Sequence, residues 1–252
     1  MQALPDLPEP VKLHADIHGE GQPRKLLLVH GLFGQARNFG SLARKLGDSF
    51  EVTVPDLRNH GRSPWTDTHT YAELAEDIAP LAGGDVLGHS MGGKTAMMLA
   101  LTRPDRVQRL IVADMAPVDY GKTIHAELEA MLALDLDQPS RSAAAEALDV
   151  EPGLKSFLVQ QLDLKEKRWL LNLETLRTEM SRIFGWSPPD AVYEGPTLFL
   201  SGADSDYVRP EHRPEIKRLF PNARFAKIPG AGHFLHAEKP AEFEAAVRAF
   251  LG

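Results

Sequence analysis

A serine lies at the centre of the segment Gly88-His89-Ser90-Met91-Gly92, which matches the pattern G-x-S-x-G. The segment follows an apolar strand-like run and precedes a helix-like one, and this is the setting that a nucleophilic serine requires. Such a sharp strand-to-helix turn projects the hydroxyl out of the sheet, and the flanking glycines leave room for the turn. Free N–H groups at the start of the helix would face an oxyanion on the attacked carbonyl. The segment therefore predicts Ser90 as the nucleophile of an acyl-transfer reaction.

A serine hydroxyl needs a general base within hydrogen-bond reach, and the chain has ten histidines. His233 has the best setting, because its Gly-Ala-Gly-His loop follows the last strand-like run and precedes the C-terminal helix-like run. His236 is the neighbouring alternative, although a structural hydrogen bond near Glu238 is the simpler role for it. Three histidines are expected to order loops at the same sheet edge, namely His30, His60 and His89. The other five are expected at the surface, namely His14, His18, His69, His125 and His212.

The loop His30-Gly31-Leu32-Phe33-Gly34 directly follows another strand-like run. Its glycines allow the backbone to turn so that one N–H, that of Leu32, faces the substrate carbonyl. The second donor is expected to be the N–H of Met91, directly after the nucleophile. Together these two groups would form an oxyanion hole.

The base needs a carboxylate to hold its tautomer, and the residues leave two places for it. One is the loop that contains Asp204, Ser205 and Asp206, where many enzymes of this kind carry the acid at the position of Ser205. The other is Asp114, at the end of the strand-like run 109–113, where a carboxylate that caps the following turn is the simpler interpretation.

Short apolar runs alternate with helix-like stretches in the first half of the chain and again after residue 195. They end at glycine or at Pro-Asp, as buried parallel strands do. The runs cover residues 25–30, 51–55, 85–88, 109–113, 196–201 and 224–229, while residues 11–18 alternate like an antiparallel edge strand. This alternation predicts an α/β fold, with a mostly parallel central sheet flanked by helices.

The alternation stops between residues 115 and 190, where apolar residues recur at helical spacing. Ser140 is typical of an N-cap, before a helix at 141–148. We expect a helical cap insertion at 115–190 and a core formed by residues 1–114 and 191–252. A connection of this length is long enough to be functional.

Composition and charge exclude several classes of protein. The chain of 252 residues has 28 Lys and Arg against 35 Asp and Glu, so its net charge of −7 argues against a nucleic-acid partner. It has no cysteine, hence no disulfide or thiolate chemistry. Residues 1–10 do not resemble a signal peptide and no apolar run could insert in a membrane, which favours a cytoplasmic location. The histidine spacings match no metal motif, and no nucleotide-binding motif occurs, so we expect neither a metal nor a cofactor.

At this point the chain resembles the small bacterial α/β-hydrolase esterases of the YbfF type. The resemblance rests on HGLFG at 30–34, RNHG at 58–61, GHSMGGK at 88–94, APVDY at 116–120 and GAGH…HAEKP at 230–240. It implies an α/β-hydrolase fold and a catalytic triad of Ser90, His233 and Asp114, with Ser205 at the usual acid position as an auxiliary partner. The chain departs from the family at Asp204 and Asp206, where an amide and a proline are expected.

The resemblance implies hydrolysis of small-molecule carboxylic esters or thioesters through an acyl-enzyme, without a cofactor. The same residues would also serve a carbon–carbon bond hydrolase or a lyase, given cationic groups in the cap for an anionic substrate. Arginines at 141, 168, 177 and 182 are available for that role. A non-catalytic small-ligand receptor is the third alternative. Lys94, one turn after the serine, could meet an anionic substrate, but a salt bridge on the helix surface is the simpler expectation. The oligomeric state stays open.

Overall fold

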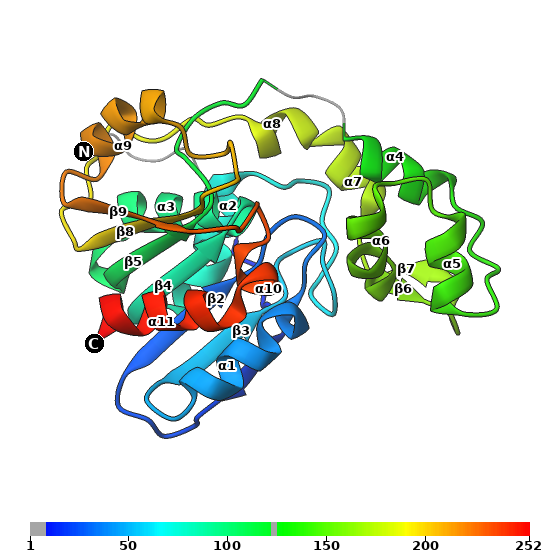
Figure 1. Cartoon of the computed structure of the whole chain (residues 1–252), viewed down its shortest axis with the longest axis horizontal. Coiled ribbons are helices and arrows are strands. Elements are labelled where there is room, and N and C mark those ends of the chain that lie inside the picture. The colour runs from blue at the N-terminus through cyan, green and yellow to red at the C-terminus, as the bar shows by residue number, and fades with distance from the viewer. Residues whose placement is uncertain (1–8, 122–124) are drawn as a thin grey trace.

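The protein forms a seven-stranded sheet in the order β1-β3-β2-β4-β5-β8-β9 (Figure 1). The computed structural model describes residues 9–121 and 125–252; residues 1–8, which carry most of the expectation about a signal peptide, and residues 122–124 lie outside it. The strands are β1 (Ala15–His18), β2 (Lys25–Val29), β3 (Glu51–Pro55), β4 (Gly84–His89), β5 (Val107–Ala113), β8 (Thr197–Gly202) and β9 (Ala223–Ile228). The fold class is confirmed, and each strand overlaps a predicted run.

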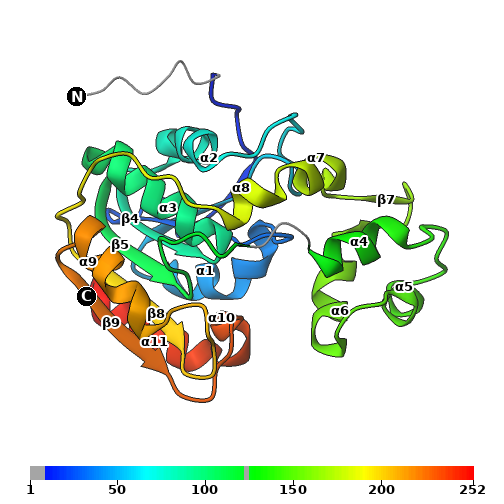
Figure 2. The same ribbon diagram turned by 90° about the horizontal axis from the view of Figure 1, so that it is seen from above.

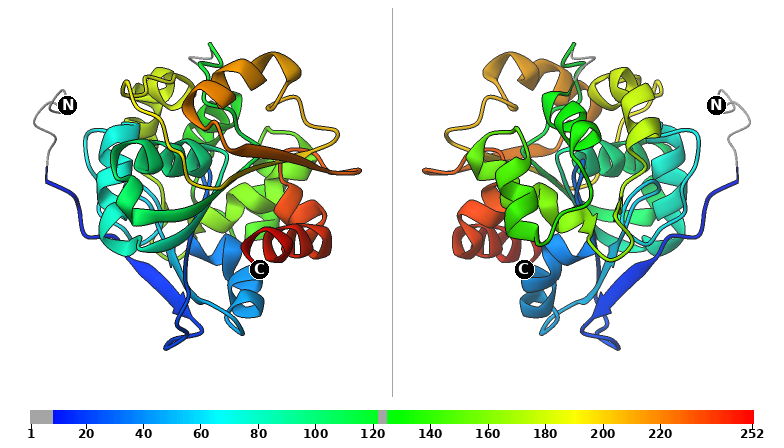
Figure 3. Two further views of the ribbon diagram at one scale, coloured as in Figure 1. Left: turned by 90° about the vertical axis from the view of Figure 1, so that its left-hand side faces the viewer. Right: turned by 90° about the vertical axis from the view of Figure 1, so that its right-hand side faces the viewer.

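The sheet is parallel except at one edge, where β1 runs antiparallel to β3 as the alternation at 11–18 predicted. In each view of Figure 3 the edge strand β1 appears in blue at the bottom, and the edge strand β9 appears in dark orange at the other edge of the sheet. Because the other strands are parallel, their carboxyl ends meet at one edge of the sheet. The loops with Leu32, Ser90, Asp114, Ser205 and His233 all leave the sheet there.

Helices cover both faces of the sheet (Figure 2). Alternate strand residues point to opposite faces, so Val86 and Leu87 of β4 belong to two separate apolar cores. One core includes residues of α2 (Tyr71–Ile78), α3 (Met91–Thr102) and α9 (Arg213–Leu219), and the other includes residues of α1 (Gly40–Leu46), α10 (Leu235–Glu238) and α11 (Pro240–Leu251). Short 3-10 helices lie at Ala36–Phe39, Ala79–Leu81, Pro104–Arg106, Val159–Gln161 and Pro210–His212. No helix within the described ranges has the length and apolarity needed to cross a bilayer.

The segment between β5 and β8 extends beside the sheet as a lobe (Figures 1 and 2). Its last helix, α8 (Met180–Phe184), is the part of the lobe that lies next to α3 (Figure 2). The helices before α8 are α4 (Ala126–Ala133), α5 (Arg141–Ala147), α6 (Pro152–Leu158) and α7 (Leu173–Thr178). Ser140 caps α5 as predicted, because its Oγ accepts from the N–H of Ala143 at 3.1 Å. A two-stranded hairpin, β6 (Leu162–Asp163) and β7 (Arg168–Trp169), was not predicted, since two-residue strands show no periodicity.

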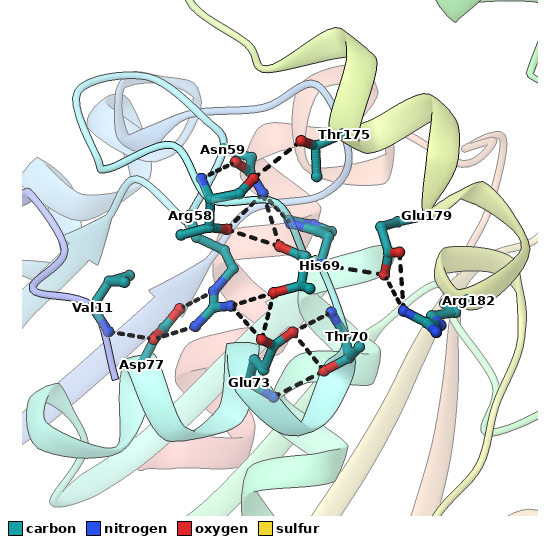
Figure 4. A network of polar contacts seen from close by, with 12 residues as sticks. Val11, Arg58, Asn59, His69, Thr70, Glu73, Asp77, Thr175, Glu179 and Arg182 are labelled. Carbon is teal, nitrogen blue, oxygen red and sulfur yellow. Dashed lines mark hydrogen bonds and ion pairs between the residues drawn. The ribbon is translucent and has the colours of Figure 1, made fainter. Parts of the chain in front are cut away.

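A buried polar network joins this lobe to the core (Figure 4). Arg58, which is 2% exposed, binds Asp77 through Nε at 2.6 Å and Glu73 through an N–H at 2.9 Å. The next residue, Asn59, accepts from the side chain of Asn172 at 3.1 Å through its amide oxygen. Because the guanidinium and both carboxylates are paired, the loop that faces the lobe is held rigidly against α2.

Candidate active site

Ser90 is the residue between β4 and α3, and its backbone is strained. Its φ of 54° and ψ of −123° lie in a region that residues other than glycine rarely adopt, as expected for a nucleophile at a sharp turn. The turn is tight enough that a Cβ on Gly88 would lie 2.1 Å from the carbonyl oxygen of Gly92. The Ser90 N–H donates to the carbonyl of Ala113 at 3.0 Å, which ties the turn to the neighbouring strand β5.

The ring of His233 reaches Ser90 from the loop after β9. Its Nε2 lies 3.0 Å from Oγ of Ser90. The ring of Tyr207 stacks on the imidazole with centroids 4.0 Å apart, and Nε2 of His89 donates to the His233 carbonyl at 2.8 Å. These contacts fix both the ring and the backbone of His233. Neither Tyr207 nor His89 was predicted to touch the base, although both are adjacent to residues that were.

Asp114 lies on the other side of the His233 ring. Its Oδ2 is 2.7 Å from Nδ1 of His233, and its side chain is fully buried. The hydroxyl of Ser205 donates to the same Oδ2 at 2.5 Å, and the N–H of Gly202 donates to Oδ1 at 3.2 Å. A carboxylate beside Nδ1 keeps the proton on that nitrogen, so the lone pair of Nε2 faces the serine hydroxyl. Like Ser90, Asp114 has a positive φ, of 50°.

The other two candidate acids point into solvent. Asp204 and Asp206 are exposed, and Asp206 pairs with Arg209 at 3.1 Å. Neither carboxylate has a hydrogen bond to His233 within the described part of the chain. The structure thus brings Ser90, His233, Asp114 and Ser205 together and leaves Asp204 and Asp206 outside.

Two backbone donors are available beside the serine. Gly31 packs so closely that a Cβ there would lie 3.1 Å from Cβ of Ser90, which puts the loop of Leu32 against the nucleophile. Met91 is the first residue of α3, so its N–H has no acceptor within the helix. Among the described residues, neither the N–H of Leu32 nor that of Met91 has a hydrogen-bond acceptor. Both groups are therefore free to bind an oxyanion.

The serine opens into a pocket with a volume of about 160 Å³. Its walls come from the core loops and from the lobe, and they are mainly apolar, with Phe33, Phe39, Met115, Leu154, Phe157, Leu158, Ile183, Phe184 and Phe234. None of the four arginines considered for an anionic substrate lines it. Arg141 donates to a backbone carbonyl, Arg177 and Arg182 pair with glutamates, and Arg168 is exposed.

Lys94 is not at the surface, so the prediction of a surface salt bridge is wrong. Its side chain is fully buried, and Nζ donates to the carbonyls of Phe184 and Gly185, each at 2.7 Å. Burial lowers the pKa of Lys94 to about 7. The nearly continuous apolar sequence of α3 could have signalled this burial, because a helix that is apolar on all sides is buried on all sides, as residues Met91 to Leu101 are.

Two histidines that were expected at the surface have other settings. His69 is buried and its Nε2 lies 3.3 Å from the sulfur of Met91, while His125 is half-buried and lines the pocket with its ring 5.0 Å from that of Phe33. His236 lines the pocket too, but Glu238 binds the N–H groups of Gly232 and Phe234 instead of this histidine.

Burial keeps the histidines around His233 neutral. It lowers the pKa of His236 to about 4 and that of His89 well below its usual range, and neighbouring histidines lower both further. A neutral His89 has one N–H, and the contact with the His233 carbonyl assigns that proton to Nε2. The described residues contain no group of three or more His, Asp or Glu side chains that could hold a metal ion.

Comparisons with known proteins agree with the fold. The profile of the alpha/beta hydrolase family matches residues 26–246. The sn-1-specific diacylglycerol lipase ABHD11 of Mus musculus is 39% identical, over 93% of this chain and 83% of its own. Esterase YbfF of Escherichia coli is 35% identical, over 90% of this chain and 92% of its own.

Among solved structures, a marine microorganism esterase superposes with a TM-score of 0.90 at 35% identity, covering 96% of this chain and 100% of that chain. The resemblance found in the sequence motifs is thus confirmed over most of the chain. The chain belongs to the alpha/beta hydrolase family, and its relatives include esterases and a lipase.

Proposed function

We propose that this α/β-hydrolase cleaves carboxylic esters with apolar acyl groups through an acyl-serine intermediate. The observation that carries the proposal is the continuous hydrogen-bonded chain from Oγ of Ser90 through His233 to Asp114, with distances of 3.0 Å and 2.7 Å. Such a chain activates a hydroxyl as nucleophile. The names of the similar esterases and lipase support the same class of substrate.

In the first half-reaction, the Ser90 oxygen bonds to the ester carbonyl carbon while its proton passes to Nε2 of His233. The N–H groups of Leu32 and Met91 stabilise the oxyanion, and Asp114 stabilises the imidazolium. Collapse of the tetrahedral intermediate breaks the bond to the alkoxy oxygen. That oxygen takes the proton from Nε2 and leaves as an alcohol.

In the second half-reaction, a water molecule attacks the acyl-serine and gives a proton to Nε2. The second tetrahedral intermediate releases the carboxylic acid and returns the proton to the Ser90 oxygen. A thioester would follow the same steps and release a thiol, so we include thioesters of the same acyl groups among the substrates.

We also propose that residues 115–190 act as a cap over the site and that residues 1–114 and 191–252 form the catalytic core. The contribution of Leu154, Phe157, Ile183 and Phe184 to the pocket walls supports this division. The same walls favour an apolar acyl chain over the anionic substrate of a carbon–carbon bond hydrolase, because the four arginines considered for that role lie elsewhere.

The proposal is tested with p-nitrophenyl esters of graded acyl length, using the wild type and Ser90→Ala. We expect turnover by the wild type and a loss of roughly 10⁴-fold or more in kcat for the variant. Ser142→Ala is a matched control, because Ser142 is exposed on α5. Undiminished hydrolysis by Ser90→Ala would remove the nucleophile, and binding without turnover by the wild type would favour a ligand receptor.

A further inference from the structure

The C-terminal end of helix α8 forms part of the pocket wall. Ile183 and Phe184, its last two residues, both line the pocket. The last carbonyls of any helix lack an intrahelical donor, and a short helix cannot hold its own position. Some other group must therefore fix this part of the wall.

Core side chains supply those donors. Nζ of Lys94 donates to the carbonyls of Phe184 and Gly185 at 2.7 Å, and the hydroxyl of Tyr71 donates to the carbonyl of Ile183 at 2.5 Å. The N–H of Tyr120 donates to the Phe184 carbonyl at 3.1 Å. The core side chains of Tyr71 and Lys94 thus bind three consecutive carbonyls, those of residues 183–185, where α8 ends.

Lys94 is well suited to this contact, because its amino group has N–H donors for both carbonyls in either protonation state, and the partial negative charge at a helix C-terminus favours a donor there. Its Nζ also lies 4.9 Å from the ring centroid of Tyr120 and 5.5 Å from that of Tyr71. Within the described ranges no carboxylate forms an ion pair with it. The carbonyls of α8 are therefore its closest polar partners.

The other end of α8 is held as well. The carboxylate of Glu179, the residue before the helix, accepts from the backbone N–H of His69 at 3.3 Å and pairs with Arg182 at 2.9 Å (Figure 4). This end does not contact the pocket, and its contacts are independent of Lys94. Loss of the Lys94 contacts would therefore release mainly the end that carries Ile183 and Phe184.

We propose that Lys94 is a positioning residue that sets the acyl-chain selectivity of the enzyme, by holding the end of α8 against the nucleophile helix α3. The inference rests on the proposed esterase function. Lys94 lies one turn after Ser90 on the same helix, so its contacts tie the pocket wall directly to the element that carries the nucleophile. The carbonyls of a released α8 would turn toward water, and the wall would move outward.

The test uses Lys94→Met, which keeps the apolar stem and removes the donors. Tyr71→Phe removes one donor at the same helix end without changing charge, so it serves even if Lys94→Met does not fold. Lys217→Met is the matched control, since Nζ of Lys217 in α9 also donates to two backbone carbonyls. They belong to Pro221, in the loop after α9, and to Ala223, the first residue of β9. Lys217 does not line the pocket.

The first measurement is hydrogen exchange of the amides at 180–186, which does not depend on ester hydrolysis. We expect faster exchange there in Lys94→Met and in Tyr71→Phe, and no change in Lys217→Met. Unchanged exchange in both pocket variants would overturn the contact, whether or not the protein proves to be an esterase.

The second measurement is kcat/KM for p-nitrophenyl acetate, butyrate and octanoate. We expect the ratio of kcat/KM for butyrate to kcat/KM for octanoate to fall by roughly tenfold in Lys94→Met, because a wall that has moved outward leaves more room for the longer chain. A tenfold change is about what one methylene group contributes in an apolar pocket, and kcat for acetate should stay within about twofold. An equal loss for all three esters would show a merely structural role. A loss confined to an ester with an anionic acyl group, such as a hemisuccinate, would assign Lys94 to substrate binding instead.

Discussion

Oδ2 of Asp114 accepts from both Nδ1 of His233, at 2.7 Å, and Oγ of Ser205, at 2.5 Å. The carboxylate comes from the end of β5, and Ser205 comes from the loop after β8, the other place where the sequence analysis expected an acid. One oxygen therefore links two alternative acid positions to the same imidazole. This arrangement makes the acid assignment testable with three substitutions of the same kind.

Asp114→Asn is expected to lower kcat for ester hydrolysis by roughly 10⁴-fold, because the amide would favour the wrong tautomer of His233. Asp204→Asn and Asp206→Asn are expected to stay within about twofold, since both carboxylates are exposed. Steady-state kinetics with one p-nitrophenyl ester checks this ranking. The opposite ranking would assign the acid to the loop after β8.

Ser205→Ala is expected to have an intermediate effect. It removes one charge-assisted hydrogen bond to Asp114 but leaves the contact with His233, so kcat should fall by about tenfold. The same assay measures this loss. A fall as large as that of Asp114→Asn would give Ser205 a larger part in the reaction than an auxiliary one.

Gly88→Ala is expected to lower the free energy of unfolding by at least ~3 kcal/mol, because its Cβ would meet the carbonyl oxygen of Gly92 at 2.1 Å and backbone atoms cannot yield cheaply. Gly83→Ala is the control, as nothing lies within 4 Å of a Cβ there, and it should stay within about 0.5 kcal/mol. Urea unfolding followed by circular dichroism provides both values, and equal values would contradict the tight turn.

Arg58→Met is expected to destabilise the protein by about 3–5 kcal/mol, because it leaves the buried carboxylates of Glu73 and Asp77 without their cation. Arg106→Met removes an exposed pair with Asp105 and should cost less than about 1 kcal/mol. Chemical denaturation distinguishes the two. A small effect of Arg58→Met would mean that the buried ion pairs with Glu73 and Asp77 do not brace the loop of Arg58 against α2 (Figure 4).

The stability of the wild type relative to Lys94→Met is expected to rise with pH between about 7 and 10.5. The folded pKa of Lys94 is about 7, whereas the ordinary value is 10.5, so the unfolded chain binds the extra proton in this range. The slope is at most about 1.4 kcal/mol per pH unit.

The groups that face Nζ of Lys94 are Asp119, whose charge raises the pKa of Lys94, and Tyr71 and Tyr120, whose own pKa values are raised by burial. Unfolding at several pH values measures the difference, and a flat difference would show that Lys94 keeps its proton.

The turn at Ser90 and the order of strands and helices could be predicted from the sequence because their causes are local. Glycine is required at position 88 because a Cβ there would meet the carbonyl oxygen of Gly92, only four residues away. The strands are predicted by their short apolar runs. The hairpin of β6 and β7 and the burial of His69 were missed, because they depend on what packs against them.

The amino-acid sequence by itself determined the fold class, the family and the sharp turn that presents Ser90. The residues alone left the acid open between Asp114 and the loop of Asp204 and Asp206, and the family resemblance implied Asp114. The tertiary structure brings Asp114 against His233, although it is 119 residues away in the chain. It also decided that Lys94 meets the carbonyls of Phe184 and Gly185 instead of water. The physical reason is the same in both cases: a side chain's partner depends on which distant backbone is brought beside it, and no local pattern records that.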